Sequence, residues 1–189
     1  MPWPAKHKQN SKERILQSAI KLFSSRGFDG VSIGDIMRDA ELTHGGFYAH
    51  FSSKQELYAK VIPVAARKSF RSKVSPESSG KEMVHELIDH YLDSKHVDQS
   101  KPPCPLAFLV TDVANREEGV RSAYRKAFNK AASLLDKQMS ADFPDSRNKA
   151  FALLAMMVGG VAIAHAVDDE ELEKSLLEAC NAVGASLIE

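Results

Sequence analysis

Apolar side chains recur every three or four positions along most of the chain, which is the spacing of amphipathic helices. One stripe, residues 15–23, ends where a basic last turn precedes Gly27, a residue suited to a helix C-terminus. A second stripe, residues 33–40, follows Ser32, and Asp35 stands where a capping box places its acidic partner. No alternating strand pattern occurs, so the sequence predicts an all-α fold.

A third, very short helix is predicted over residues 44–50, with Thr43 as its cap. Ser53 and Glu56 then have the spacing of a capping box and open a fourth helix through residue 62, where Pro63 is expected to kink it. Three short helices, the second and third joined by a tight turn, form a helix-turn-helix pattern.

The remaining chain predicts longer helices, with a proline-containing loop over residues 98–103. The domain prediction is a flexible basic arm over 1–10, a helix-turn-helix domain over 11–62 and a helical regulatory and dimerisation domain over 63–189. The helices expected in the last part cover residues 81–92, 104–116, 118–140, 146–167 and 170–188.

The short third helix has an unusual composition. Gly45 and Gly46 are adjacent, and each glycine costs about 1 kcal/mol relative to alanine inside a helix. Close approach of the helix backbone to a bulky partner such as a DNA groove would favour the missing side chains. The polar groups around them can bond to phosphates or base edges, and Lys54 follows where its charge and the helix dipole favour a phosphate.

Charge is distributed unevenly, although the formal net charge is zero. Residues 1–75 contain 13 Lys and Arg against 6 Asp and Glu, whereas residues 76–189 contain 12 against 19. A basic first third indicates that only this part meets a polyanion.

Two segments, residues 14–36 and 40–58, together resemble the DNA-binding domain of the TetR family of bacterial repressors. The resemblance rests on the A-x-x-L-F-x-x-x-G-F pattern, the capped short helix, the F-Y-x-H-F segment and the following S-x-K-x-x-L. It implies that Tyr48 and Lys54 touch the DNA backbone and that Ser32 caps a helix crossing it. Gly46 departs from the family, in which threonine or serine is frequent. The predicted DNA-binding residues are Ser32, Thr43, His44, Gly45, Gly46, Tyr48, His50 and Lys54.

The resemblance also implies a helical regulatory domain whose last two helices form a four-helix dimer interface. Small and apolar residues follow one side of each of these helices, which lets helices approach closely. The predicted interface residues are Ala152, Ala155, Met156, Gly159, Ile163, Leu172, Leu176 and Val183. A monomer that buries these residues in its own core is the alternative.

A ligand pocket is predicted between the middle helices, from apolar faces with occasional polar tips. Its candidate residues are Tyr91, Cys104, Phe108, Thr111, Tyr124, Phe128 and Met157. Cys104 lies at a predicted helix N-terminus, where a thiol pKa can fall, and its Cys-Pro-Leu segment resembles one in a branch of TetR-like proteins. A thiol that senses electrophiles or oxidants and an inert buried thiol are both open.

No cofactor and no metal site are predicted, because the two cysteines are far apart and no metal-ligand spacing occurs. The N-terminus has no apolar signal core, and a cytoplasmic location without membrane partners is expected. The predicted partners are double-stranded operator DNA, a second copy of the chain and an unknown small-molecule effector. The predicted function is a non-enzymatic transcription repressor. An activator on the same scaffold, a helical cysteine-dependent enzyme and a protein-binding adaptor are the alternatives.

Overall fold

The computed structural model describes residues 5–71, 74–94 and 104–189, and all regular elements within these ranges are helices. They follow one another as α1 (Ala5–Arg26), α2 (Ile33–Asp39), the 3-10 helix η1 (His44–Ala49), α3 (Lys54–Arg71), α4 (Gly80–Tyr91), α5 (Pro105–Phe108), α6 (Val110–Ala114), α7 (Glu118–Met139), α8 (Ser146–Ala166) and α9 (Glu170–Ser186). The predicted all-α fold is confirmed.

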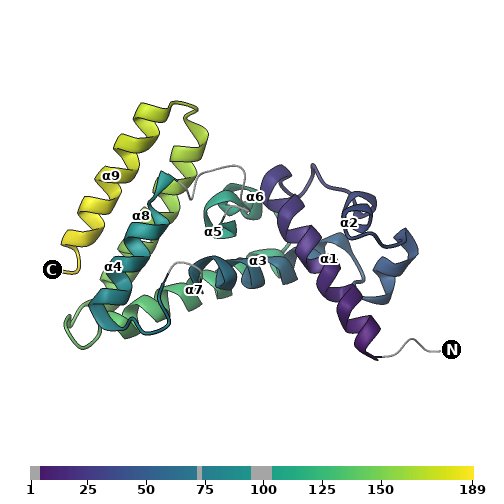
Figure 1. The fold of residues 1–189 in the computed structure, drawn as a ribbon, viewed down its shortest axis with the longest axis horizontal. Coiled ribbons are helices and arrows are strands. Elements are labelled where there is room, and N and C mark those ends of the chain that lie inside the picture. The colour runs from purple at the N-terminus through teal and green to yellow at the C-terminus, as the bar shows by residue number, and fades with distance from the viewer. Residues whose placement is uncertain (1–4, 72–73, 95–103) are drawn as a thin grey trace.

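The molecule is elongated, with a different group of helices at each end (Figure 1). Helices α1, α2 and η1 gather at the end that holds the N-terminus. Helix α3 leads away from them and packs along α7, while α4, α8 and α9 form the opposite end with the C-terminus. Helix α3 therefore links the N-terminal helices to the rest of the molecule.

Glycines determine the turn after α1. Gly27 has φ +65° and its N–H donates to the carbonyl of Phe23 at 2.9 Å, which is the predicted helix C-terminus. At Gly30 a Cβ atom would lie 2.4 Å from the carbonyl oxygen of Arg26, so no side chain fits there. This tight turn delivers the chain to Ser32, the N-cap of α2. The predicted capping box with Asp35 is complete.

One continuous cluster of buried apolar side chains extends from α1 to α9. In its N-terminal part Phe23, Phe28, Phe47 and Phe51 are at most 6% exposed. The first two rings stack with centroids 5.9 Å apart, and the last two lie 5.7 Å apart. Aromatic packing therefore holds the short helices in place, as their spacing predicts.

Three expectations about helix boundaries need correction. Helix α1 begins at Ala5, so residues 5–10 belong to it and are not an arm, because no glycine or proline interrupts the chain before Arg26. The single helix expected over 104–116 is divided into α5 and α6 at Leu109, which leaves helical geometry. Helix α3 contains Pro63, as expected, but it extends to Arg71 instead of ending near residue 62. The loop predicted over 98–103 lies outside the described residues.

Helix α8, Ser146–Ala166, meets the length and composition criteria for a membrane-spanning helix. Only 44% of its apolar window is buried, and the helix packs between α7 and α9. Exposed aliphatic side chains remain on both neighbouring helices, Ile163 on α8 and Leu172 and Val183 on α9.

Candidate DNA interface

Helix η1 presents one buried side and one exposed side. Phe47 is fully buried, whereas its neighbour Tyr48 is 60% exposed, the largest exposed fraction among the large hydrophobic residues that the structure describes. Thr43 and His44 are also exposed, and the ring centroids of His44 and Tyr48 lie 6.4 Å apart. The segment is therefore anchored from behind by Phe47, and it displays hydroxyl and imidazole groups outward.

The two glycines of η1 have no requirement inside the protein. A Cβ atom at Gly45 would meet nothing within 4 Å, and one at Gly46 would make ordinary contacts, the nearest at 3.6 Å to Met37. Neither glycine has a positive φ. Packing and backbone geometry both tolerate a side chain here, so neither explains the two glycines.

Lysines of α1 border η1. Lys8 and Lys12 stand on α1, and both are exposed. Burial, and then the charges of these two lysines, lower the pKa of His50 below its ordinary value of 6.5. The ammonium of Lys12 lies 5.9 Å from the ring centroid of Phe51. The exposed side of η1 is thus bordered by positive charge, as a polyanion requires.

Capping interactions fix the helices on either side of η1. The Ser32 hydroxyl accepts from the N–H of Asp35 at 3.1 Å, while the Asp35 carboxylate accepts from the N–H of Ser32 at 3.0 Å. The start of α3 differs from the prediction: the Ser53 hydroxyl accepts from the N–H of Glu56, but the Glu56 carboxylate bonds to Ser52 instead of Ser53. The side chain of Thr43 makes no cap hydrogen bond, so its hydroxyl is available to a partner.

Lys54 stands at the start of α3, as predicted, and it also makes internal hydrogen bonds. Its ammonium donates to the backbone carbonyls of Phe28 and Val31, both at 2.8 Å, and lies 4.0 Å from the ring centroid of Phe28. Burial is the main cause that lowers its pKa. Because two of its three donors are used inside the protein, Lys54 joins α3 to the turn before α2. Its contact with a DNA phosphate stays a prediction.

An ion-pair network connects this turn to the rest of the molecule. Arg116, between α6 and α7, pairs with Asp29 of the turn and with Asp112 of α6, and its guanidinium lies 4.5 Å from the Phe28 ring centroid. The Tyr58 hydroxyl of α3 donates to Asp112 at 2.6 Å. Hydrogen bonding to Arg116 is the main cause that lowers the pKa of Asp29. The sequence did not predict this network, because Asp29 and Arg116 are 87 residues apart.

Several of the residues predicted to line a pocket serve as packing residues. The Tyr91 hydroxyl donates to the Cys104 sulfur at 3.1 Å, and the Tyr124 hydroxyl donates to the carbonyl of Leu106 at 2.6 Å. Cys104 is 1% exposed, and it caps a helix of only four residues. Thr111 is exposed and departs from the predicted interior position.

The remaining predicted pocket residues are aromatic or sulfur-containing. Phe108 packs against His165 with centroids 4.4 Å apart, Phe128 stacks on Phe151 at 6.3 Å, and Met157 is fully buried. The structure does contain a cleft of about 490 Å³, between α3 and α7, and none of the seven predicted residues lines it.

The outer face of α8 and α9 exposes aliphatic side chains. Ile163, Leu172 and Val183 are 54%, 52% and 53% exposed, and Ala152 and Ala155 are exposed on the same pair of helices. The other predicted interface residues, Met156, Gly159 and Leu176, are half-buried. We call this set the α8–α9 face.

The family model for bacterial regulatory proteins of the tetR family matches residues 15–61, which cover α1 from Ile15, α2, η1 and the first part of α3. The matched segment is a DNA-binding domain of the TetR family. It includes every part of the exposed η1 segment, so the chain carries this domain at the end of the molecule that holds the N-terminus.

The curated relatives of this chain are named as HTH-type transcriptional regulators. It is 27% identical over 116 residues to the uncharacterized HTH-type transcriptional regulator YfiR of Bacillus subtilis, covering 59% of this chain and 56% of the relative. It is 35% identical over 51 residues to the biofilm operon negative regulator IcaR of Staphylococcus epidermidis, covering 27% and 28%. The chain thus aligns with little more than half of the first relative and about a quarter of the second.

Solved structures share the fold over almost the whole chain. The reduced form of E. coli NemR matches with a TM-score of 0.81 at 20% identity, over 95% of this chain and 97% of that one. A TetR transcriptional regulator from Legionella pneumophila matches with a TM-score of 0.78 at 23% identity, over 94% and 97%. At these identities the likeness establishes the fold of the regulatory helices and no ligand.

Proposed function

We propose that the protein is a homodimeric transcription repressor whose η1 segments enter successive major grooves of a near-palindromic operator. The observation that supports this proposal most directly is the exposed η1 surface. Polar and aromatic side chains surround two glycines that the fold itself does not require. Buried Phe47 holds this surface rigid, and lysines of α1 border it.

Dimerisation is supported by the α8–α9 face. Large aliphatic side chains more than half exposed on two adjacent helices would remain in water in a monomer, whereas a second copy would bury them. A two-fold axis through this face places the two DNA-binding ends symmetrically. Two such ends can read half-sites about 34–36 Å apart, which is one turn of the duplex.

Release from DNA by a small molecule is the regulatory part of the proposal. An effector that moves the regulatory helices would act on the DNA-binding end through α3 and through the Arg116 network, because both connect the two ends. An electrophile or oxidant acting on Cys104 is a narrower form of this proposal. It requires that the segment around Cys104 opens first, since the thiol is 1% exposed.

Titration of the DNA upstream of the protein's own gene tests the proposed function. We expect tight binding whose affinity falls steeply between two salt concentrations, because phosphate contacts release counterions. Tyr48→Ala should weaken binding about tenfold or more at unchanged melting temperature, while the control Val110→Ala, also exposed but on α6, should change neither. Equal affinity of both variants for this DNA would exclude the η1 surface as the reader.

Thiol sensing is tested separately. Mass-spectrometric labelling under mild electrophile, in parallel with DNA titration, should find Cys104 modified whenever binding is lost. Loss of DNA binding with unmodified Cys104 would exclude thiol chemistry as the switch.

A further inference from the structure

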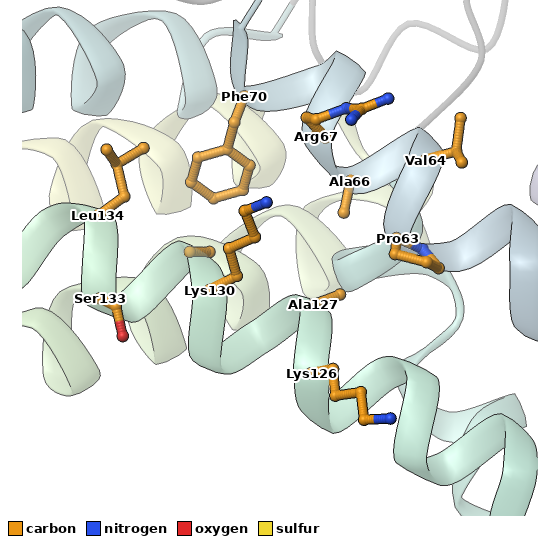
Figure 2. Close-up of a pocket in the computed structure, with 11 residues that line it drawn as sticks. Pro63, Val64, Ala66, Arg67, Phe70, Lys126, Ala127, Lys130, Ser133 and Leu134 are labelled. Atoms are coloured by element: carbon orange, nitrogen blue, oxygen red, sulfur yellow. The ribbon is translucent and has the colours of Figure 1, made fainter.

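The cleft between α3 and α7 combines an apolar floor with positive charges at its border (Figure 2). Its volume of about 490 Å³ lies within the range of small-molecule sites. Phe70 and Ala66 approach from α3, and Ala127, Ala131 and Leu134 approach from α7. The alanines are the reason for the hollow, because their short side chains leave the space between the two helices unfilled.

Three cations line the same cleft. Arg67 belongs to α3, and Lys126 and Lys130 stand one turn apart on α7. Figure 2 shows the Lys130 side chain extending from α7 toward α3 beside Phe70. No carboxylate is among the lining residues.

These cations have no counter-ion among residues 5–71, 74–94 and 104–189. Within the described part of the chain, none of the three takes part in a hydrogen bond, ion pair or ring contact, although other surface arginines, such as Arg116 and Arg125, do. Among nearby acids, Asp136 lies beyond Ser133 on α7, and it accepts from the Ser146 hydroxyl and lies 3.9 Å from Arg147. The positive potential of the cleft is therefore not neutralised by the protein.

We propose that this cleft binds a small organic anion with an apolar body, whose carboxylate, sulfonate or phosphate group is held by Arg67, Lys126 and Lys130. The apolar floor accounts for the body, since its burial is favourable without any specific polar partner. The three cations account for the anionic group and disfavour a cationic ligand of the same shape.

The position of the cleft gives the ligand a way to act, and this step rests on the proposed function. The half of α3 that lines the cleft continues directly into the half that begins at Lys54, beside η1. Pro63 lines the cleft and lacks the N–H that would bond to the preceding turn, so the hydrogen-bond ladder of α3 is interrupted there. A ligand that separates α3 from α7 would change the direction of α3 and displace η1.

The binding test uses two fluorescent probes that share one ring system, and it needs no DNA. We expect 8-anilinonaphthalene-1-sulfonate, which is anionic, to bind the wild-type protein at one site per chain. N-phenyl-1-naphthylamine, which lacks the sulfonate, should bind more weakly. Rising salt should weaken the anionic probe only, because salt screens charge and spares apolar contact.

Matched variants locate the site. The double variant Arg67→Gln with Lys130→Gln should weaken the anionic probe about tenfold and leave the neutral probe unchanged, at roughly three- to fivefold per partly exposed charge. Lys68→Gln with Lys137→Gln, an equal charge change on α3 and α7 outside the cleft, should change neither probe. The variants remove no internal bond, and circular dichroism checks their folding.

Equal affinities of the two probes for wild type, or an anionic probe insensitive to both salt and the double variant, would overturn the proposal. DNA titration with and without the anionic probe then reports regulation. Absent DNA binding would count against the proposed function alone, whereas intact DNA binding with no probe bound would count against the cleft alone.

Discussion

The two ends of the molecule expose different chemistry on similarly built helices. At the DNA-binding end, η1 displays Thr43, His44 and Tyr48 around glycines, with lysines nearby. At the opposite end, the α8–α9 face displays Ile163, Leu172 and Val183. The first surface suits a hydrated polyanion and the second suits a copy of itself, so the proposed function combines polar recognition at one end with apolar burial at the other.

Removing the apolar surface should have the largest effect on function. The double variant Ile163→Glu with Val183→Glu places two carboxylates at a face that we expect to be buried between copies. It should sediment as a monomer, and operator affinity should fall by about a hundredfold or more because two linked half-sites become independent. Analytical ultracentrifugation and fluorescence anisotropy measure the two quantities. Val110→Glu, exposed on α6, is the control, and a dimeric double variant would contradict the assignment of this face.

Variants of the neighbouring residues Phe47 and Tyr48 should affect different quantities, the first protein stability and the second DNA binding. Phe47→Ala removes a fully buried ring and should lower the free energy of unfolding by about 3–5 kcal/mol. Tyr48→Ala removes a mostly exposed ring and should leave that free energy nearly unchanged. Chemical denaturation measures both variants, and a large loss of stability in Tyr48→Ala would mean that this ring serves the core.

Replacing Lys54 tests whether its side chain stabilises the fold through internal hydrogen bonds or contacts a DNA phosphate. Lys54→Met should cost about 2 kcal/mol of stability, because two carbonyls lose a charged donor. The salt dependence of DNA binding should keep its slope. A slope reduced by about one unit at unchanged stability would instead identify Lys54 as a phosphate contact.

The Arg116 network should produce the smallest effect, one that depends on pH. The pKa of Asp29 is lowered in the folded protein, so its contribution is complete above its ordinary pKa of 3.8 and is lost as the pH falls through the lower folded value. The melting temperature of wild type should exceed that of Arg116→Gln near neutral pH, and the difference should shrink below about pH 4. A difference that stays constant across this range would exclude the carboxylate pairing as its cause.

Local patterns in the sequence predicted the DNA-binding end well. The capping box of Ser32 and the C-terminal Gly27 depend on residues a few positions apart, so both could be predicted and both are confirmed. The long helices α7, α8 and α9 also lie where their apolar stripes predict them.

Features that depend on distant partners could not be predicted in the same way. Lys54 is oriented by backbone carbonyls more than twenty residues away in the sequence. Arg116 is oriented by Asp29, which is 87 residues away. The α3–α7 cleft arises where short side chains of two separate helices meet, a pairing that no periodicity reveals. The DNA, ligand and interface roles of the remaining named residues stay predictions.

The most direct measurement of the central claim replaces a glycine that the fold does not need. Gly45→Leu has open space for its side chain and a better helix former, so its melting temperature should equal or exceed that of wild type. Its operator affinity, measured by fluorescence anisotropy, should fall at least about tenfold because the new side chain keeps the η1 backbone from the groove. Wild-type affinity in this folded variant would contradict insertion of η1 into DNA.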